Sequence, residues 1–180
     1  ILAWIIVLAI LAAAVFVFVS VFYEDTKKKL DEMNYPRTYS TYVEKAAKDY
    51  DLDPALIYAV IHTESGFDPK AESGVGAKGV MQMMPSSFEW LQEQRGCAGQ
   101  YTEDDLFDPE ICIDYGSYLL KYFYDYYGTE RSAIAAYNAG FVVSDWLSDT
   151  NYSSDGKNLD SIPYPETENY VDKVESAKEM

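Results

Sequence analysis

Glu64 is an ionisable residue at a position where an amphipathic helix would ordinarily carry an apolar side chain. We predict a helix that begins at Pro54 and ends before Gly66, because proline favours the first turn of a helix and glycine its end. Within this helix Leu56, Val60 and Glu64 follow one another at a spacing of four. Residues four apart lie on one face of a helix, so the carboxyl group continues the apolar stripe.

This placement would make the Glu64 side chain a weaker acid than an ordinary glutamate. Contact with apolar neighbours disfavours the charged carboxylate, and the last turn of a helix carries the negative end of the helix dipole. Both effects raise the pKa, and a carboxylic acid that stays protonated near neutral pH can serve as a general acid. The alternative, a surface glutamate at a frayed helix end, is equally compatible with the periodicity alone.

The rest of the chain is typical of a mainly α domain that must position this residue. Apolar residues recur at helical spacing in several segments, which proline or capping residues precede. The predicted helices begin at Ser40, Pro54, Pro85, Pro109, Thr129 and Pro165. On the helix from Pro109 we predict a long buried stripe of Ile111, Tyr115, Tyr118, Leu119, Tyr122 and Tyr126. Segment 66–79 is rich in glycine, so we predict an irregular loop with at most a small β-hairpin.

The N-terminal segment predicts a membrane anchor. Residues 1–23 carry no charge, and at about 1.5 Å per residue such a helix crosses a hydrocarbon core of roughly 30 Å. A cleaved signal peptide would have a shorter apolar stretch, of about 7 to 15 residues, behind a basic start. We therefore expect a transmembrane anchor at 1–23, a charged tether at 24–38 and a single folded domain at 39–180.

The orientation of this anchor is less directly indicated. Lys27, Lys28 and Lys29 follow the apolar segment and would favour a cytoplasmic C-terminal part by the positive-inside tendency. The sequence begins with isoleucine, so we expect a preceding flank that could outweigh these lysines.

Charge and cysteine content exclude two classes of site. A net charge of −16 disfavours a polyanionic partner, so we expect no nucleic acid to bind. Cys97 and Cys112 are the only cysteines and lack the spacing of zinc ligands, so no metal site is expected. In an oxidising compartment they could form one disulfide that closes a loop of about 15 residues, or they could remain two free thiols.

Four segments, taken together, resemble one protein family. They are 64–69 (ESGFDP), 76–85 (GAKGVMQMMP), 135–140 (AAYNAG) and 166–171 (ETENYV). Any one of them alone is a weak signal, but four in the same order with plausible gaps are specific. Over about residues 39–174 the chain resembles the lytic transglycosylases of the soluble-transglycosylase type. The resemblance implies a lysozyme-like, goose-type α domain.

The resemblance also implies an activity, the cleavage of the β-1,4 bond between N-acetylmuramic acid and N-acetylglucosamine in peptidoglycan without net addition of water. Glu64 matches the family's single catalytic acid. It would protonate the glycosidic oxygen and then, as a carboxylate, accept the proton of the muramoyl 6-hydroxyl, which closes a 1,6-anhydro ring. Because the substrate supplies the nucleophile, no second carboxylate is needed, unlike in ordinary glycoside hydrolysis. No cofactor is expected.

The resemblance assigns substrate contacts to seven further positions: Ser65, Gly79, Met81, Gln82, Tyr137, Asn138 and Tyr170. Segment 79–82 matches the family's Gly-Leu-Met-Gln groove segment with valine in place of leucine, although its methionine could equally fill the core. Tyr137 and Asn138 match a pair that contacts sugar beside the acid. Tyr170 matches a tyrosine whose hydroxyl approaches the acid. Ser65 could instead cap the end of its helix.

Two other functions remain open at this stage. A goose-type lysozyme-like hydrolase would add water with the help of a base, for which Asp68, Glu72 and Asp108 are candidates. A catalytically silent glycan-binding scaffold would keep the fold without turnover. His62, the one histidine, lies two residues before Glu64 and so faces away from it, which favours a structural role. We expect glycan strands of peptidoglycan as the partner, and a domain held on the wall side of the cell membrane.

Overall fold

The structure, a computed structural model, describes residues 17–19, 22–23 and 38–179 of the chain. The chain divides into two units, Ile1–Arg37 and Thr38–Met180. Residues 17–19 and 22–23 are helical, but most of the predicted anchor and tether lies outside the described residues. Across the part of the chain that is described, no helix combines the length and the apolar character needed to cross a membrane.

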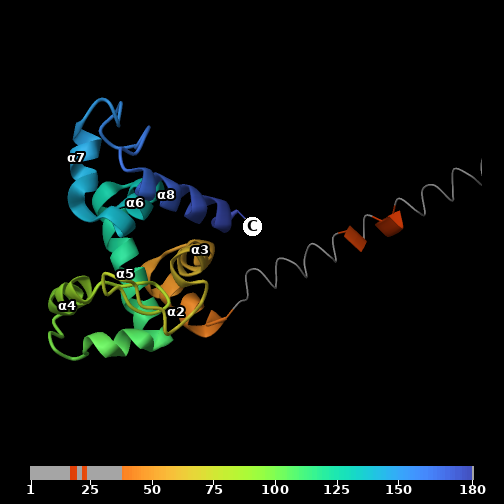
Figure 1. The fold of residues 1–180 in the computed structure, drawn as a ribbon, viewed down its shortest axis with the longest axis vertical. Coiled ribbons are helices and arrows are strands. Elements are labelled where there is room, and N and C mark those ends of the chain that lie inside the picture. Colours follow the sequence, from red (N-terminus) through yellow and green to blue (C-terminus); the bar gives the residue numbers. More distant parts are fainter. Residues whose placement is uncertain (1–16, 20–21, 24–37, 180) are drawn as a thin grey trace, which may run out of the picture. The chain divides into compact units, whose positions relative to one another are not determined.

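Helices build the Thr38–Met180 unit (Figure 1). They are α2 (Ser40–Tyr50), α3 (Pro54–Ser65), α4 (Pro85–Gln94), α5 (Pro109–Tyr127), α6 (Glu130–Ala139), α7 (Val143–Ser148) and α8 (Pro165–Lys178), with the 3-10 helices η1 (Glu103–Phe107) and η2 (Gly140–Val142). The described residues contain no β-strand, only isolated bridges that pair Lys78 with Glu72 and with Met83. The prediction of a mainly α domain with at most a small hairpin is confirmed.

Helix α5 is the element around which this unit is arranged. It packs against α2, α4, η1 and α6, while α8 packs against α3 and α6. In Figure 1, α2 and α4 lie toward one end of α5, and α6 and α7 lie toward the other. Because α3 packs against both α2 and α8, it links the two groups of helices.

The ends of α3 and α5 follow local signals in the sequence. Asp53 and Asp108 cap them, and each carboxylate accepts a hydrogen bond from the amide two residues further on, at 2.9 Å. Gly66 ends α3 in the left-handed conformation with a φ of 58°, which glycine adopts without steric cost. The other predicted helix starts are confirmed to within one residue.

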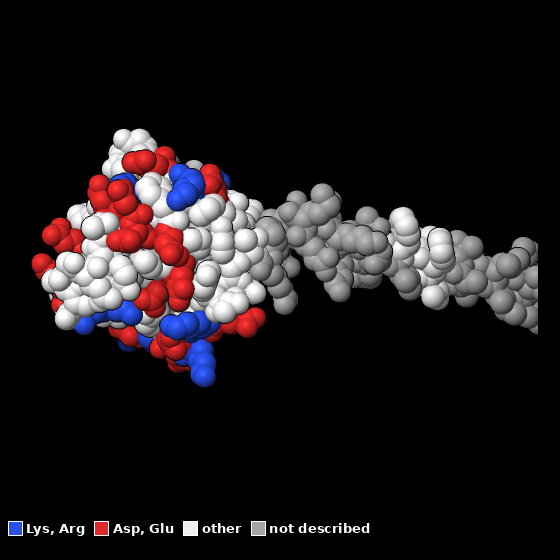
Figure 2. Space-filling view, turned by 90° about the horizontal axis from the view of Figure 1, so that it is seen from below, with Lys and Arg blue, Asp and Glu red and all other residues white. Residues whose placement is uncertain are grey.

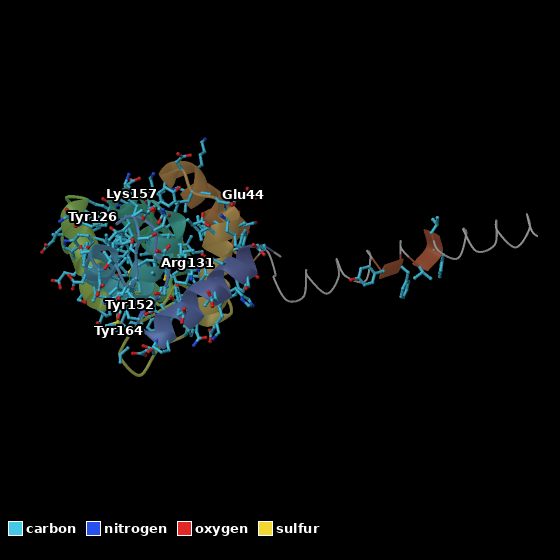
Figure 3. All side chains as sticks on the ribbon, turned by 90° about the horizontal axis from the view of Figure 1, so that it is seen from above. Glu44, Tyr126, Arg131, Tyr152, Lys157 and Tyr164 are labelled. Carbon is cyan, nitrogen blue, oxygen red and sulfur yellow. The ribbon has the colours of Figure 1, made fainter. Side chains whose placement is uncertain are left out.

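The buried face of α5 differs from the predicted stripe. Tyr126 is 58% exposed and lies at the edge of the domain (Figure 3). Half-buried side chains occupy three more of the predicted positions, Ile111, Tyr118 and Tyr122. Cys112, Leu120 and Phe123 are buried in their place. At the three tyrosine positions the prediction was wrong because a tyrosine can cover apolar surface with its ring while its hydroxyl stays in water.

Three short helical elements, η1, η2 and α7, are absent from the sequence prediction. The 3-10 helix η1 has five residues and α7 has six, so neither is long enough to show a helical period. In α7, Val143, Trp146 and Leu147 are nevertheless buried. Tertiary packing therefore holds α7, whereas η1 also has a local capping box between Thr102 and Asp105.

Candidate active site

Glu64 lies in the last turn of α3, on the same face as two core residues. Leu56 and Val60 are 1% and 0% exposed, whereas Glu64 is partly buried. The hydroxyl of Tyr170, on α8, donates a hydrogen bond to Glu64 Oε1 at 2.7 Å. The carboxyl group that ends the apolar stripe is thus held by a residue 106 positions further along the chain.

Burial raises the pKa of Glu64 from its ordinary value of 4.5 to about 7. The hydrogen bond from Tyr170 acts in the opposite direction, because a donated hydrogen bond stabilises the carboxylate. None of the ion pairs found among the described residues involves Glu64. With burial and no paired cation, this carboxyl group can release and regain a proton near neutral pH.

The loop between α3 and α4 is held from two helices. Ser65, the residue after Glu64, donates through its hydroxyl to the carbonyl oxygen of Val80 at 2.7 Å. Tyr137, on α6, donates through its hydroxyl to the carbonyl oxygen of Met81 at 2.9 Å. Two neighbouring carbonyl groups are therefore fixed between α3 and α6. The charge of Glu64 acts on Tyr137 as well: burial, and then that charge, raise the pKa of Tyr137 well above its usual range.

Three residues for which the sequence predicts substrate contacts shape the loop itself. Gly79 has a φ of 76°, and a Cβ there would lie 2.0 Å from the carbonyl oxygen of Leu106, so only glycine fits. Met81 is 0% exposed, and its sulfur would lie 2.5 Å from a Cβ added at Gly116 of α5. Gln82 Nε2 donates to two carbonyl groups of the same loop, both at 3.0 Å. The Met81 side chain thus has no exposed surface, and the Gln82 amide nitrogen already has partners.

Asn138 is exposed at the end of α6. Thr167, on α8, donates through its hydroxyl to Asn138 Oδ1 at 2.8 Å. Thr167 is itself 3% exposed, and sequence patterns did not single it out as a partner of α6. Its position inside the fourth motif was the only signal. The motifs therefore meet in the fold: the ends of α3 and α6, the loop after α3 and the first turns of α8 are joined by hydrogen bonds.

A family comparison identifies this arrangement. The family model described as the transglycosylase SLT domain matches residues 41–159, a span that contains Glu64 and three of the four motifs. The chain belongs to the transglycosylase SLT domain family.

Several named proteins are similar to this SLT domain. The soluble lytic murein transglycosylase of Escherichia coli K12 is 32% identical over 146 residues, which cover 79% of this chain and 23% of that protein. The transglycosylase of Enterobacteria phage PRD1 is 37% identical over 117 residues, 65% of this chain and 40% of its own. The membrane-bound lytic murein transglycosylase C of Pectobacterium atrosepticum is 33% identical, with coverages of 78% and 45%. The chain spans about a quarter of the length of the E. coli relative.

Solved structures share the fold of this SLT domain. The 70-kDa soluble lytic transglycosylase of E. coli gives a TM-score of 0.72 at 28% identity, covering 82% of this chain and 24% of that one. An inactive glutamate-to-glutamine mutant of the Pseudomonas aeruginosa lytic transglycosylase Slt gives 0.71 at 30% identity with the same coverage. A complex of the 70-kDa soluble lytic transglycosylase with bulgecin A gives 0.73 at 28% identity and the same coverage.

Lys78 anchors the loop of this SLT domain to η1. The residue is 7% exposed, and its ammonium nitrogen lies 3.0 Å from Asp104 and 3.2 Å from Glu103. It also lies 5.4 Å from the centre of the Phe107 ring. A buried ammonium group requires such partners, so Lys78 holds the loop between α3 and α4 against η1. A lysine between alanine and glycine carries no periodic signal, which is why the sequence did not predict this role.

Cys97 and Cys112 are free thiols in this structure, and a disulfide between them in an oxidising compartment stays a prediction. Cys112 is fully buried on α5, where its sulfur accepts the amide of Met81 at 3.4 Å. Burial raises the pKa of this thiol to about 12. Cys97 Sγ lies 3.3 Å from the hydroxyl of Tyr115. The two sulfurs thus contact different partners.

Other ionisable residues near the motifs have local structural contacts. The His62 ring packs with the ring of Phe67 at a centroid distance of 6.2 Å. Asp68 accepts the amide of Lys70 at 2.8 Å, and Asp108 caps α5. Within the described ranges, no group of three or more His, Cys, Asp or Glu side chains is placed to hold a metal ion. Carboxylates form a band across the face seen in Figure 2, with lysines and arginines mostly near its margins.

Proposed function

We propose that this chain is a peptidoglycan lytic transglycosylase that cleaves the MurNAc-β-1,4-GlcNAc bond with Glu64 as its catalytic acid. The observation that carries the proposal is a carboxyl group with a pKa near 7, held by Tyr170 within an SLT domain. Relatives named lytic murein transglycosylases support the substrate. A related structure whose glutamate-to-glutamine mutant is inactive supports a glutamate as the essential group.

The proposed reaction needs both forms of one carboxyl group. Protonated Glu64 gives its proton to the glycosidic oxygen as the bond from that oxygen to muramoyl C1 breaks. The Glu64 carboxylate then accepts the proton of the muramoyl 6-hydroxyl, whose oxygen bonds to C1 and closes the 1,6-anhydro ring. A pKa near 7 suits both steps, because neither form is strongly disfavoured at neutral pH. Tyr170 stabilises the carboxylate between the two proton transfers.

The other candidate residues divide into two proposed roles. The loop that would line the glycan is positioned by Ser65, Gly79, Met81 and Tyr137, which act through hydrogen bonds and packing. Direct contact with sugar is assigned to exposed amide groups, and above all to Asn138. An amide can donate to and accept from the acetamido groups of the substrate. Gln82 retains its side-chain oxygen for the same purpose, since its nitrogen is bound within the loop.

Product analysis tests this function. The full chain in detergent micelles is incubated with purified peptidoglycan, and the soluble products are examined by mass spectrometry. Muropeptides that end in 1,6-anhydromuramic acid, lighter by one water than reducing-end products, are the expected result. Reducing-end muramic acid would instead support a goose-type hydrolase. Binding to peptidoglycan without soluble products would support a silent scaffold.

We also propose that residues 1–23 anchor the enzyme in the cell membrane with the SLT domain on the wall side. The uncharged N-terminal segment supports this, and so does the name of the membrane-bound relative from Pectobacterium. Lys27, Lys28 and Lys29 favour the opposite orientation. A protease added outside intact, wall-stripped cells should digest the domain. Full protection of the domain would contradict the wall-facing orientation.

A further inference from the structure

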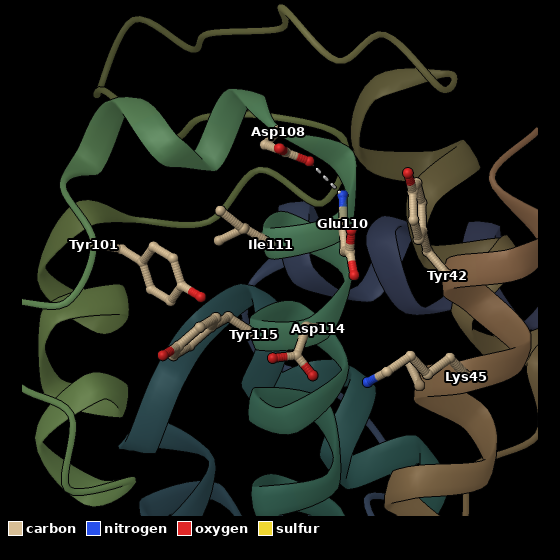
Figure 4. A pocket seen from close by; sticks show the side chains of 9 residues that line it. Tyr42, Lys45, Tyr101, Asp108, Glu110, Ile111, Asp114 and Tyr115 are labelled. Carbon is tan, nitrogen blue, oxygen red and sulfur yellow. Dashed lines mark hydrogen bonds between the residues drawn. The ribbon is translucent and has the colours of Figure 1, made fainter.

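A pocket of about 410 Å³ opens between α2 and the start of α5 (Figure 4). Its volume is within the range of small-molecule sites. In Figure 4, Tyr101 and Tyr115 lie on one side of the pocket and Tyr42 and Lys45 on the other. The remaining lining residues are Ala46, Asp108, Glu110, Ile111 and Asp114.

This pocket lies on a different face of α5 from the candidate active site. Cys112 and Gly116 face the loop that carries Met81, whereas Ile111 and Tyr115 line the pocket. Successive residues of a helix are rotated by about 100°, so these two pairs point in different directions. The pocket shares no lining residue with the surroundings of Glu64 described above.

The charge of the lining favours a cation. Three carboxylates and one lysine line the pocket, so an anionic ligand would meet repulsion. The pKa of Lys45 is raised, first by its hydrogen bond to Asp49 and, to a lesser extent, by the charges of Asp114 and Glu110. Asp49 lies outside the lining, so the pocket's own carboxylates account for the smaller part of this shift. Tyrosine rings and Ile111 supply apolar walls that suit an aliphatic stem.

One lining carboxylate is open to a ligand. Asp108 caps α5, and Asp114 is held by Arg95 and by the hydroxyl of Tyr50. Within the part of the chain that is described, the Glu110 carboxylate makes no hydrogen bond or ion pair. The hydroxyl groups of two lining tyrosines, Tyr42 and Tyr101, likewise have no hydrogen-bond partner among the described residues. The pocket is therefore lined by one carboxylate and two hydroxyl groups that are available to bind a ligand.

We propose that this pocket binds a primary ammonium group on an aliphatic stem, with Glu110 as its counter-ion and the tyrosine rings around the stem. The occupant that we assign is the free side-chain amine of the diamino acid in murein peptides that are not cross-linked through that amine. This assignment rests on the proposed function. It gives the SLT domain a contact with the peptide part of its substrate, separate from the glycan site at Glu64.

Amine binding is tested with the full chain in detergent micelles and a pair of matched probes. Nα-acetyl-lysine amide should bind in an NMR titration, and Nα-acetyl-norleucine amide, which lacks the ammonium, should not. Glu110→Gln should weaken binding of the lysine probe roughly two- to fivefold, the size expected of an exposed charge pair. Lys45→Met should strengthen it by a similar factor, because it removes a competing cation. Equal binding of the two probes, or effects of the same sign in the two variants, would overturn the proposal.

The source of the amine is tested by activity. On peptidoglycan that retains its peptides, Glu110→Gln should raise KM with little change in kcat. On glycan strands from which an amidase has removed the peptides, the difference in KM between this variant and the unmodified chain should disappear. An equal rise in KM on both substrates would overturn the peptide assignment. If the unmodified chain cleaved neither substrate, the proposed function would fail, while the probe titration would still decide whether the pocket binds amines.

Discussion

Two carboxylate groups in this domain accept a hydrogen bond from a tyrosine, and their surroundings differ in one respect. Glu64 accepts from Tyr170 at 2.7 Å, and burial raises the pKa of Glu64 to about 7. Asp114 accepts from Tyr50 on one oxygen and from Arg95 on the other, the latter at 2.6 Å. The first pair lacks a cation, and the second has one.

The difference shows what a cation does for a partly buried carboxylate. The Arg95 guanidinium also stacks on Tyr115, 4.5 Å from the ring centre, so its position is fixed by packing as well as by charge. Through these contacts Asp114, on α5, holds Tyr50 of α2 and Arg95 at the end of α4. At Glu64 the hydrogen bond from Tyr170 lowers the pKa by less than burial raises it, so the pKa stays at about 7. The structural pair and the reactive pair therefore differ by one arginine.

The largest expected effect is on activity, which should depend on the Glu64 carboxyl group and not on that of Asp114. Glu64→Gln should lower the rate of anhydro-muropeptide release by about 10²- to 10⁴-fold, because glutamine cannot carry the proton. Asp114→Asn is the matched control and should keep a kcat close to that of the unmodified chain, because Asp114 lines the proposed amine pocket and any effect of its loss should appear in KM. Initial rates on peptidoglycan measure both, with circular dichroism to verify that each variant is folded. A fully active Glu64→Gln variant would remove Glu64 from the mechanism.

The second effect concerns stability and pH. The folded-state pKa of Glu64, about 7, lies above its ordinary value of 4.5, so its contribution to stability is complete below about pH 4.5 and is lost as the pH rises through 7. Glu64→Gln does not titrate. Its advantage in unfolding free energy over the unmodified chain should therefore grow by up to about 3 kcal/mol between about pH 4 and about pH 8.5.

Urea unfolding at the two pH values measures this advantage. Glu44→Gln, at an exposed position on α2, is the control for the same change of side chain. An advantage of Glu64→Gln that is equal at both pH values would show that Glu64 is not destabilised by its charge.

The third effect removes the cation from the structural pair. Arg95→Leu should destabilise the domain by about 1–3 kcal/mol at neutral pH, because Asp114 keeps its partial burial without a paired charge. Asp114→Asn added to this variant should recover part of the loss. Lys45→Met breaks only the exposed pair with Asp49, so it should cost less than about 0.5 kcal/mol. Urea unfolding measures all three, and a double variant no more stable than Arg95→Leu would argue against the stranded charge.

The smallest expected effect changes the tyrosine of the reactive pair. Tyr170→Phe removes the hydrogen bond that lowers the pKa of Glu64, so the pKa should rise further. The alkaline limb of the pH–rate profile should then move to higher pH, and kcat should fall. Tyr50→Phe, which changes the other pair, should leave the limb unchanged. A limb that moves to lower pH in Tyr170→Phe would show that the hydroxyl acts otherwise than as a donor to the carboxylate.

Local signals in the sequence predicted the bounds of the helices that carry the site. They did not predict the contacts between residues far apart in the chain. The bounds of α3 follow from Pro54 and Gly66, because capping depends on neighbouring residues alone. The bond between Tyr170 and Glu64 joins segments 106 residues apart, and no periodicity encodes such a pairing. Only the ordered motifs brought Tyr170 into the set of candidates.

The roles of the loop residues could not be predicted for a different reason. Gly79 stays a predicted sugar contact, and its missing Cβ also makes room for the carbonyl of Leu106. Lys78 was not selected at all, although it is buried against two acidic residues of η1. In both cases the partner is an element too short to be recognised in the sequence. The packing of an irregular loop becomes visible only when its neighbours are placed.

The hydrogen bond from Tyr170 of α8 to Glu64 also determines at which stage of folding the candidate site forms. During synthesis or export, Glu64 emerges 106 residues before the tyrosine that holds it. Until α8 docks on α3 and α6, the acid has neither its hydrogen-bond donor nor that part of its enclosure. A chain that has not been synthesised as far as Tyr170 therefore cannot assemble the pair. If Glu64 is the acid that we propose, the SLT domain would become active only after α8 has folded onto α3 and α6.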